Sequence, residues 1–284
     1  MARAFKPMPV VLDLVYKNFT SYKNLILFMG KNGKKTLAET LRNWDFEYKE
    51  KKSLTSEDSF LVNHGLINEG KNSLKLGLTG NPDISESTMI FRDLSIAEYT
   101  GGKIHVPHVS SEKTVKIIKE FKQKGANVTA EVTPHHLALT DDMLINYDTN
   151  AKVAPPLRKI KDSNALINGL RDGIIDCIAT DHAPHSNLDK FCTLDDAANG
   201  ISGLETSLGL SMILFHKHNV PLSLLIDKLS SSPSRVFKLN SGTLKIGSPA
   251  DVTIFDPYKE WVVNTNKFIS KGKNSPLERL NLKG

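Results

Sequence analysis

Cysteine is scarce in this 284-residue sequence, and long apolar runs are missing. The two cysteines, Cys177 and Cys192, have no second cysteine nearby, which argues against a cysteine zinc site or a disulfide framework. No stretch approaches the roughly eighteen apolar residues of a membrane span, and residues 1–30 lack the apolar core of a signal peptide. We therefore expect reduced cysteines, no membrane partner and a cytoplasmic location.

A strong excess of one charge is also missing. The net charge of +6 would suit a nucleic-acid partner, but lysines alternate with glutamates on predicted helix faces, as in residues 112–124. This alternation is typical of a solvated surface, so we expect no nucleic-acid partner. With 39% hydrophobic and 24% charged residues, the chain can bury the core of one large domain and a small one.

The sequence pattern divides the chain into three regions. Residues 1–53 show no clear period and remain poorly assigned. Residues 54–239 alternate strand and helix patterns, which is typical of parallel α/β units. From 240 to 284 the pattern changes to short β segments separated by Gly and Pro turns, which indicates a small appended sheet.

Helices and strands in the second and third regions are predicted from caps and apolar spacing. The first three helices combine a polar start, an apolar stripe at helical spacing and a Gly after their end, whereas the last two are predicted without such caps. The predicted helices cover residues 87–100, 111–124, 162–172, 204–216 and 223–229. The predicted strands cover residues 103–109, 127–132, 174–180, 243–246, 251–255 and 260–263.

Polar side chains gather where three of the predicted strands end, within residues 104–110, 129–136 and 180–185. In parallel α/β folds the carboxyl ends of strands share one face, where reactive residues collect. His108 and Asp181 supply an imidazole nitrogen and a carboxylate oxygen, the donors that a catalytic divalent metal uses. An aspartate beside metal-bound water can also move the proton to a leaving nitrogen, which suits amide hydrolysis.

A structural explanation competes with this one at every histidine. A lone histidine such as His108 is more often a satisfied core or surface residue than a ligand. For His105, His135 and His136 we favour a structural role, because a ligand cluster cannot use every nearby imidazole. Asp181 is the strongest candidate, since Pro184 fixes a tight turn directly after a strand.

Several motifs resemble the dihydroorotase branch of the amidohydrolase superfamily. In order along the chain they are NEG (68–70), LGLTGNP (76–82), TAEVTPHH (129–136), APPLR (154–158), DHAPH (181–185), GLET (203–206) and the closing stretch 242–256. The resemblance implies an α/β fold, an incomplete TIM-type (β/α)8 barrel of the metal-dependent hydrolase type with a small C-terminal β-sandwich portion. It also implies a binuclear zinc centre and the reversible hydrolysis of L-dihydroorotate to N-carbamoyl-L-aspartate in pyrimidine biosynthesis.

The resemblance assigns roles residue by residue. His108 is similar to a zinc ligand, and Asp181 to a ligand that is also the catalytic acid and base. His185 and the pair Asn199-Gly200 correspond to substrate contacts. Ala154 stands where many relatives carry a substrate-binding asparagine.

The sequence also departs from the family pattern. The family's His-x-His-x-Arg strand, which supplies two zinc ligands and an arginine, is absent, and Thr55 stands at another ligand position. Only Lys31-Asn32-Gly33 resembles the place of a metal-bridging carboxylate. About 180 residues read as barrel, against about 250 for the complete fold. We therefore expect either an incomplete chain or a shortened, inactive relative.

Two other functions remain open. A hydantoinase or allantoinase would share the fold and the metal centre. A non-catalytic dihydroorotase-like subunit that stabilises aspartate transcarbamoylase would need no metal, because a scaffold keeps its helices and sheet without one. The expected partners are thus a small-molecule substrate and either a second copy of the chain or a transcarbamoylase.

Overall fold

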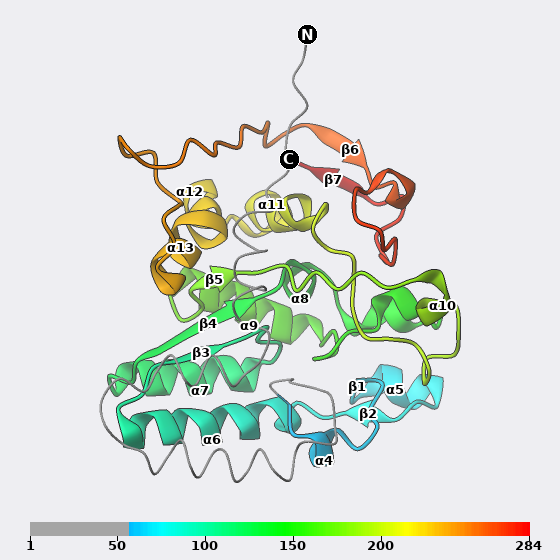
Figure 1. Ribbon diagram of the computed structural model, residues 1–284. Helices are drawn as coiled ribbons and strands as arrows, with labels where there is room; N and C mark the ends of the chain where they lie inside the picture. Colours follow the sequence, from blue (N-terminus) through cyan, green and yellow to red (C-terminus); the bar gives the residue numbers. More distant parts are fainter. Residues whose placement is uncertain (1–56) are drawn as a thin grey trace.

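The computed structural model describes residues 57–284, so the predictions for residues 1–53 and for Thr55 lie outside the described residues. Figure 1 shows α6 and α7 side by side on one side of a small parallel sheet, with α11, α12 and α13 on the other. The first elements are α4 (Ser59–Val62), β1 (Ile67–Asn68), α5 (Lys71–Leu76), β2 (Gly80–Asn81) and α6 (Ile84–Thr100). The strands β1 and β2 pair in parallel, and the short helix α5 connects them.

Three parallel strands in the order β3–β4–β5 form the central sheet. Ile104 of β3 pairs with Val128 of β4, and Val132 of β4 pairs with Ile178 of β5. Parallel strands need long crossovers, and helices occupy both of them, so the three carboxyl ends open at one edge. The elements are β3 (Ile104–Val106), α7 (Glu112–Gln123), β4 (Val128–Val132), α8 (Pro134–Ala138), η1 (Asp141–Leu144), η2 (Thr149–Ala151), α9 (Ile160–Arg171) and β5 (Cys177–Ile178).

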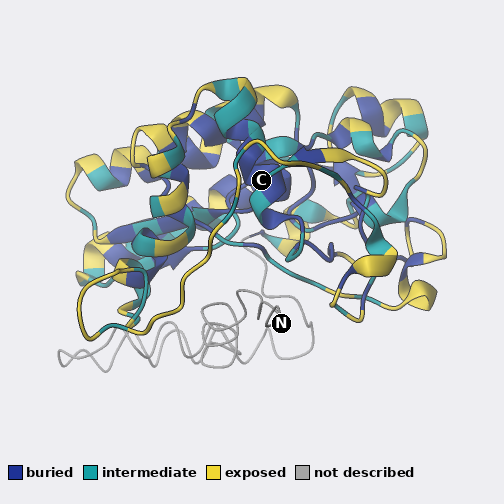
Figure 2. Cartoon of the chain, turned by 90° about the horizontal axis from the view of Figure 1, so that it is seen from above, coloured by how far each residue is buried: buried dark blue, intermediate teal, exposed yellow. Residues whose placement is uncertain are grey.

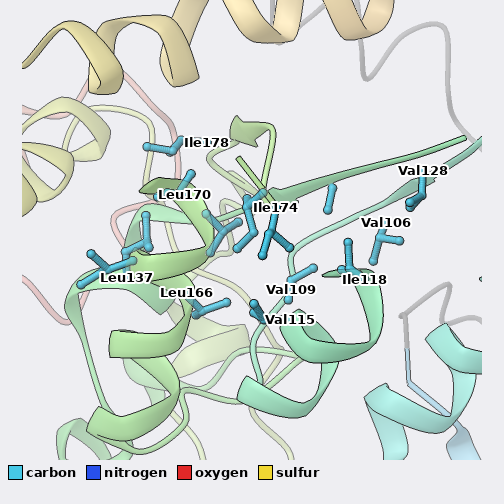
Figure 3. Close-up of a cluster of buried hydrophobic side chains, with 14 of the residues drawn as sticks. Val106, Val109, Val115, Ile118, Val128, Leu137, Leu166, Leu170, Ile174 and Ile178 are labelled. Atoms are coloured by element: carbon cyan, nitrogen blue, oxygen red, sulfur yellow. The ribbon is translucent and has the colours of Figure 1, made fainter. Parts of the chain in front are cut away.

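The main apolar core lies between this sheet and its helices. Val115, Ile118 and Phe121 repeat at helical spacing on the buried face of α7, and all three are buried. Figure 3 shows Val115 and Ile118 of this face close to strand residues such as Val106, with Leu166 and Leu170 of α9 beside them. Exposed residues lie on the outer surfaces of the helices (Figure 2). The predicted apolar faces of these two helices are confirmed.

The first long helix starts earlier than predicted. The predicted start at Ser87 is wrong, because α6 begins at Ile84 with Asp83 in the N-cap position. Ser85 and Glu86 look like loop residues in the sequence, but both are fully buried and hydrogen-bonded: Ser85 donates to the Pro82 carbonyl, and Glu86 accepts from Ser110. Tertiary partners therefore extend this helix by one turn.

The start of α7 agrees with the sequence. Ser111 is its N-cap, and the Ser111 hydroxyl accepts a hydrogen bond from the Thr114 backbone N–H at 3.2 Å. This contact satisfies one of the free N–H groups of the first turn. The predicted cap is confirmed.

The two strands that precede the candidate metal ligands are shorter than predicted. β3 stops at Val106, where Pro107 has no N–H to donate and His108 takes a φ of +32°. β5 covers only Cys177–Ile178, and Asp181 takes a φ of +45°. The chain thus turns at His108 just before the end of the first predicted strand, and at Asp181 directly after the end of the second.

The last third of the described chain packs α11 against a small hairpin-like sheet. Glu260 of β6 pairs antiparallel with Lys283 of β7, and the Trp261 indole N–H donates to the Gly284 carbonyl at 3.1 Å. A second apolar cluster joins this sheet to α11 through residues such as Leu210 and Leu282. The elements are α10 (Asn187–Lys190), α11 (Ser207–His218), α12 (Leu222–Ile226), the π-helical turn η3 (Asp227–Ser231), α13 (Ser232–Phe237), β6 (Glu260–Val262), η4 (Thr265–Lys267) and β7 (Asn281–Lys283).

Two predicted strands do not form. Residues 243–246 and 251–255 run as an irregular segment between α13 and β6 (Figure 1), and no described residue pairs with them in a sheet. Leu244, Ile246 and Ile254 of this segment are exposed. Alternation alone was a poor guide here, because a strand also needs a hydrogen-bonded neighbour.

Cys177 is buried in β5, Cys192 is exposed, and both are free thiols. Across residues 57–284, no helix combines the length and the apolar character that crossing a bilayer requires.

Candidate active site

His108 is held in an uncommon backbone conformation directly after β3. Its φ of +32° is one that a side chain with a Cβ adopts only when the surroundings enforce it. The His108 Nδ1 atom is buried, and no hydrogen-bond partner for it exists among residues 57–284. An imidazole nitrogen placed in this way is available to a ligand.

Glu131 of β4 lies next to His108 and interacts with it through charge and through the His108 backbone N–H. The Glu131 carboxylate contacts His105 Nε2 at 3.1 Å, and His105 Nδ1 contacts the Thr129 hydroxyl at 2.8 Å. Burial opposes ionisation of Glu131. Hydrogen bonding and charge from His105, together with the backbone N–H of His108, outweigh burial and lower the pKa of Glu131. With these contacts both ring nitrogens of His105 have partners within the protein.

Asp181 occupies the matching place after β5. It follows buried Thr180 and, like His108, has a left-handed backbone, with φ of +45°. Both His108 and Asp181 act electrostatically on the same buried ring, His136. The two sequence-predicted metal donors therefore border one region, around α8.

The pair His135-His136 at the start of α8 is fully enclosed. The His136 Nε2–H donates to the Pro155 carbonyl at 3.0 Å, and its Nδ1 contacts the Thr133 hydroxyl at 2.8 Å. Burial lowers the pKa of His136 to about 4. Burial, with the charges of His136 and His108, also lowers the pKa of His135 well below its ordinary value. Both rings are therefore neutral near pH 7, and His136 has the contacts of a structural residue.

The predicted substrate contacts that follow β5 lie together. The His185 Nε2 atom contacts the Asn199 carbonyl at 2.9 Å, and the Gly200 N–H donates to the Lys152 carbonyl at 2.9 Å. Gly200 has a φ of +141°, and a Cβ there would lie 2.4 Å from the Ala183 Cβ. Glycine is therefore required at this position. Ala154 lies two residues beyond Lys152, on the segment that contacts this loop.

Asn274 joins these parts, although sequence reasoning did not select it. Its side-chain amide donates to the carbonyls of Ala183 and Gly200, each at 3.0 Å, and its Oδ1 accepts the His185 N–H at 2.8 Å and the Ser202 hydroxyl at 2.6 Å. Asn274 is 4% exposed. No periodicity surrounds this residue in the sequence, so only the tertiary structure reveals its role.

Arg158 is the centre of a second group of buried polar contacts. Its guanidinium donates to the Asn81 carbonyl at 2.7 Å and to the Ser110 hydroxyl at 3.2 Å, and it lies 3.4 Å from the Glu57 carboxylate. Burial raises the pKa of Glu57, and the charge of Arg158 opposes this shift. Because Ser110 is two residues after His108, this network helps to fix the loop that carries the histidine.

His182, next to Asp181, belongs to a third group of contacts. The Leu204 N–H donates to His182 Nδ1 at 3.2 Å, so the neutral ring carries its proton on Nε2, which faces the Ser270 hydroxyl at 3.2 Å. Glu205 accepts the Ser270 N–H at 2.7 Å through one oxygen, whereas its Oε2 is buried and has no partner within residues 57–284. These contacts support the turn that presents Asp181.

The described residues do not form a complete metal site by themselves. No group of three or more His, Cys, Asp or Glu side chains within residues 57–284 is arranged to hold a metal ion. A catalytic zinc takes at least three protein ligands, and His108 and Asp181 supply two. The remaining candidate positions, Thr55 and 31–33, lie outside the described residues.

Comparison with known proteins identifies the class to which the chain belongs. The amidohydrolase family matches residues 87–277, and this chain belongs to that family. It is 47% identical over 228 residues to a dihydroorotase from Syntrophus aciditrophicus, which covers 80% of this chain and 54% of the relative. It is 48% identical to a dihydroorotase from Trichlorobacter lovleyi, which covers 78% of this chain and 52% of the relative. The chain spans about half the length of the curated relatives that it matches.

Solved structures agree on the fold class. An L-hydantoinase (dihydropyrimidinase) from Arthrobacter aurescens is 31% identical with a TM-score of 0.68, and covers 72% of this chain and 46% of its own. A dihydropyrimidinase from Brevibacillus agri has a TM-score of 0.72 at 22% identity, with coverage of 81% and 52%. The described residues therefore have a TIM-barrel-type fold, although their strands do not close into a barrel.

Proposed function

We propose that this chain is a dihydroorotase, which opens the cyclic amide of L-dihydroorotate to N-carbamoyl-L-aspartate, and closes it again, in pyrimidine biosynthesis. The observation that carries this proposal is the identity of 44% to 48% with relatives named dihydroorotase, over about 80% of the chain. The hydantoinase structures are less similar, at 22% to 31% identity. This difference favours dihydroorotate over a hydantoin as the substrate.

The proposed architecture follows the same relatives. Residues 54–239 form part of a (β/α)8 barrel, of which β3–β4–β5 are three neighbouring strands. Residues 240–284 form the carboxyl-terminal β portion of a small sandwich. The antiparallel pairing of β6 with β7 supports this arrangement.

Asp181 is the proposed catalytic acid and base. Hydrolysis of the ring amide requires a group that accepts a proton from attacking water and then delivers it to the ring nitrogen. A carboxylate suits both steps, and the turn after β5 presents Asp181 at the edge of the sheet where His108 also lies. His185, Asn199 and Gly200 form the proposed substrate-binding edge. Ala154 offers only its backbone there, because its side chain has no hydrogen-bonding group.

Zinc is the proposed cofactor of the complete site. The unpartnered Nδ1 of His108 and the carboxylate of Asp181 would be two of its donors. Zinc supplies an activated water when it is bound in such centres. Residues 57–284 do not supply a third donor to this group, so zinc binding at the complete site needs further ligands.

The test is turnover of L-dihydroorotate by the purified full chain with added zinc, followed by the loss of its ultraviolet absorbance, with hydantoin assayed in parallel. Because the family's His-x-His-x-Arg ligands are absent from this chain, we expect slow turnover that is confined to dihydroorotate, and a further loss of kcat in Asp181→Asn, because the group that transfers the proton is gone. Asp251→Asn, an exposed residue, is the matched control. Turnover of hydantoin without dihydroorotate would contradict the substrate assignment.

A second candidate function is a non-catalytic subunit that stabilises aspartate transcarbamoylase. The observation that favours it is the missing third metal donor among residues 57–284. Here we expect no zinc by metal analysis, no turnover, and co-elution with a transcarbamoylase in gel filtration. A homodimer that turns over dihydroorotate would exclude this candidate and support the first.

A further inference from the structure

Two buried lysines, Lys152 and Lys190, lie beneath the loop that carries Asn199 and Gly200. They are 6% and 4% exposed, respectively. No carboxylate of residues 57–284 lies within ion-pair distance of either ammonium group; backbone carbonyls surround both instead. Burial of a cation is costly unless its hydrogen atoms are bonded. These carbonyl oxygens accept hydrogen bonds from the two ammonium groups and so offset that cost.

Each ammonium group meets three carbonyl oxygens. Lys190 Nζ donates to Ala198 at 2.7 Å, to Thr149 at 3.0 Å and to Lys152 at 3.3 Å. Lys152 Nζ donates to Leu194 at 2.5 Å, to Ala197 at 2.7 Å and to Asp195 at 3.3 Å. An ammonium group has three hydrogens, so the number of acceptors matches the number of donors at both lysines.

These contacts join two segments that have little regular structure. The acceptors belong to residues 149–152 and 194–198, which lack the backbone ladder of a long helix or a sheet. The same segments are joined by the Gly200 N–H, which donates to the Lys152 carbonyl at 2.9 Å. Buried carbonyl groups need donors, and here the lysines supply donors that secondary structure does not. We refer to Lys152 and Lys190 as the lysine pair.

We propose that the lysine pair consists of positioning residues, which fix the backbone of residues 194–200 so that Asn199 and Gly200 form a rigid substrate-binding edge beside His185. The geometry supports this directly, because Lys190 holds the carbonyl of Ala198, the residue just before Asn199. His185 then contacts the Asn199 carbonyl at 2.9 Å. The substrate-binding part rests on the proposed function, whereas the effect on the loop backbone does not.

The charged state of Lys190 provides a built-in probe. Burial, aided by the neighbouring charge of Lys152, lowers the pKa of Lys190 to about 8, while Asp148 and Cys192 oppose this shift. Around Lys152, burial also lowers the pKa, and Asp195, Cys192 and Asp196 oppose it. A neutral amine has two hydrogens and a lone pair, so it cannot donate to three carbonyls. Deprotonation of Lys190 therefore loosens the loop.

The first experiment is hydrogen exchange measured by mass spectrometry on the full chain. Lys190→Met and Lys152→Met keep an apolar stem without a donor, and Lys119→Met, at an exposed position of α7, is the control. We expect exchange in 193–201 to be about tenfold faster in both loop variants, with α7 unchanged. Unchanged exchange in 193–201, or an equal increase in α7, overturns the proposal.

The same hydrogen-exchange measurement on wild-type protein at several pH values is an independent test, because it uses no variant that could fail to fold. After correction for intrinsic exchange rates, residues 193–201 lose protection as the pH rises through about 8, whereas α7 does not. Lys190→Met shows no such step. A wild-type loop whose protection is constant from pH 7 to pH 9 overturns the role of Lys190.

Calorimetric titration with N-carbamoyl-L-aspartate then separates this proposal from the proposed function. We expect the Kd to rise about tenfold in Lys190→Met and to stay at the wild-type value in Lys119→Met. If the wild-type chain does not bind the ligand, the substrate assignment fails, while hydrogen exchange still decides whether the pair fixes the loop. Equal affinity in wild type and Lys190→Met, with a faster-exchanging loop, overturns the substrate-positioning role.

Discussion

The α/β core around α7 and the loop of residues 182–201 are held in place by different forces. In the core, apolar side chains such as Ile118 and Phe121 are almost completely buried. In the loop, polar groups do this work: Asn274, Lys152 and Lys190 donate to backbone carbonyls. The core resists change through close packing, and the loop through satisfied hydrogen bonds.

This difference shows why the candidate catalytic residues lie where they do. His108 and Asp181 follow strands of the rigid core, at turns with positive φ. The proposed substrate contacts lie on the polar loop. A site of this kind takes its reactive groups from the stable sheet and its binding edge from a segment whose conformation can be tuned by single polar residues.

The largest effect on this comparison is expected from Phe121→Ala in the core. Phe121 is 2% exposed and packs edge to face on Phe91, with 5.7 Å between ring centroids. We expect the free energy of unfolding to fall by about 3–5 kcal/mol, because truncation leaves a cavity. Urea unfolding followed by circular dichroism measures it. Phe191→Ala in the loop is the matched control: Phe191 is 95% exposed, and its loss should change little. Equal losses in the free energy of unfolding in both variants would contradict the view that close apolar packing holds the core and not the loop.

Asn274→Ala tests the loop in the same assay. Truncation leaves the carbonyls of Ala183 and Gly200 without this donor, so we expect a loss of about 2–3 kcal/mol. Exposed Asn266→Ala is the control and should be near neutral. An Asn274→Ala loss below about 0.5 kcal/mol would mean that polar contacts contribute little to holding the loop.

His136 lies at the boundary between the two regions and gives a pH dependence. Its pKa is lowered to about 4 in the folded chain, mainly by burial. Below about pH 6.5 the unfolded chain binds a proton that the folded chain does not, so the free energy of unfolding falls between about pH 6.5 and 4. We expect wild type to lose roughly 2 kcal/mol more than His136→Gln over this window. Exposed His64→Gln should follow wild type. Parallel curves for wild type and His136→Gln would contradict the assignment.

The smallest effect concerns the helix cap. Ser111→Ala removes the acceptor for the Thr114 N–H and should cost about 1 kcal/mol. Ser111→Asp should recover little, because Glu86 already faces this helix start and a second carboxylate would repel it. Thermal unfolding measures both. Full recovery in Ser111→Asp would show that the Glu86 contact is unimportant for the cap.

The sequence predicted the regular elements well wherever one face is buried. The apolar stripe of α7 and its Ser111 cap were confirmed because local propensity and tertiary packing favour the same structure. The start of α6 was wrong because the partners of Ser85 and Glu86 lie elsewhere in the sequence. The strands at 243–246 and 251–255 were wrong because pairing is a property of two segments, and a single pattern reports only one.

The candidate site divides in the same way. His108 and Asp181 were selected from their places after predicted strands, and the structure puts both at sharp turns beside His136; their roles remain proposals. Asn274, Arg158 and the lysine pair could not be assigned these roles from sequence, because most of their partners lie far away along the chain.

The sequence by itself determined the family, the alternation of strands and helices, and the residue types able to perform hydrolysis, because these depend on local pattern and on motifs in a fixed order. Only the tertiary structure decided which carbonyls the buried lysines hold, how far each strand extends, and how many metal donors residues 57–284 bring together. Those properties depend on contacts between distant segments, and the periodicity of one segment carries no information about its partner.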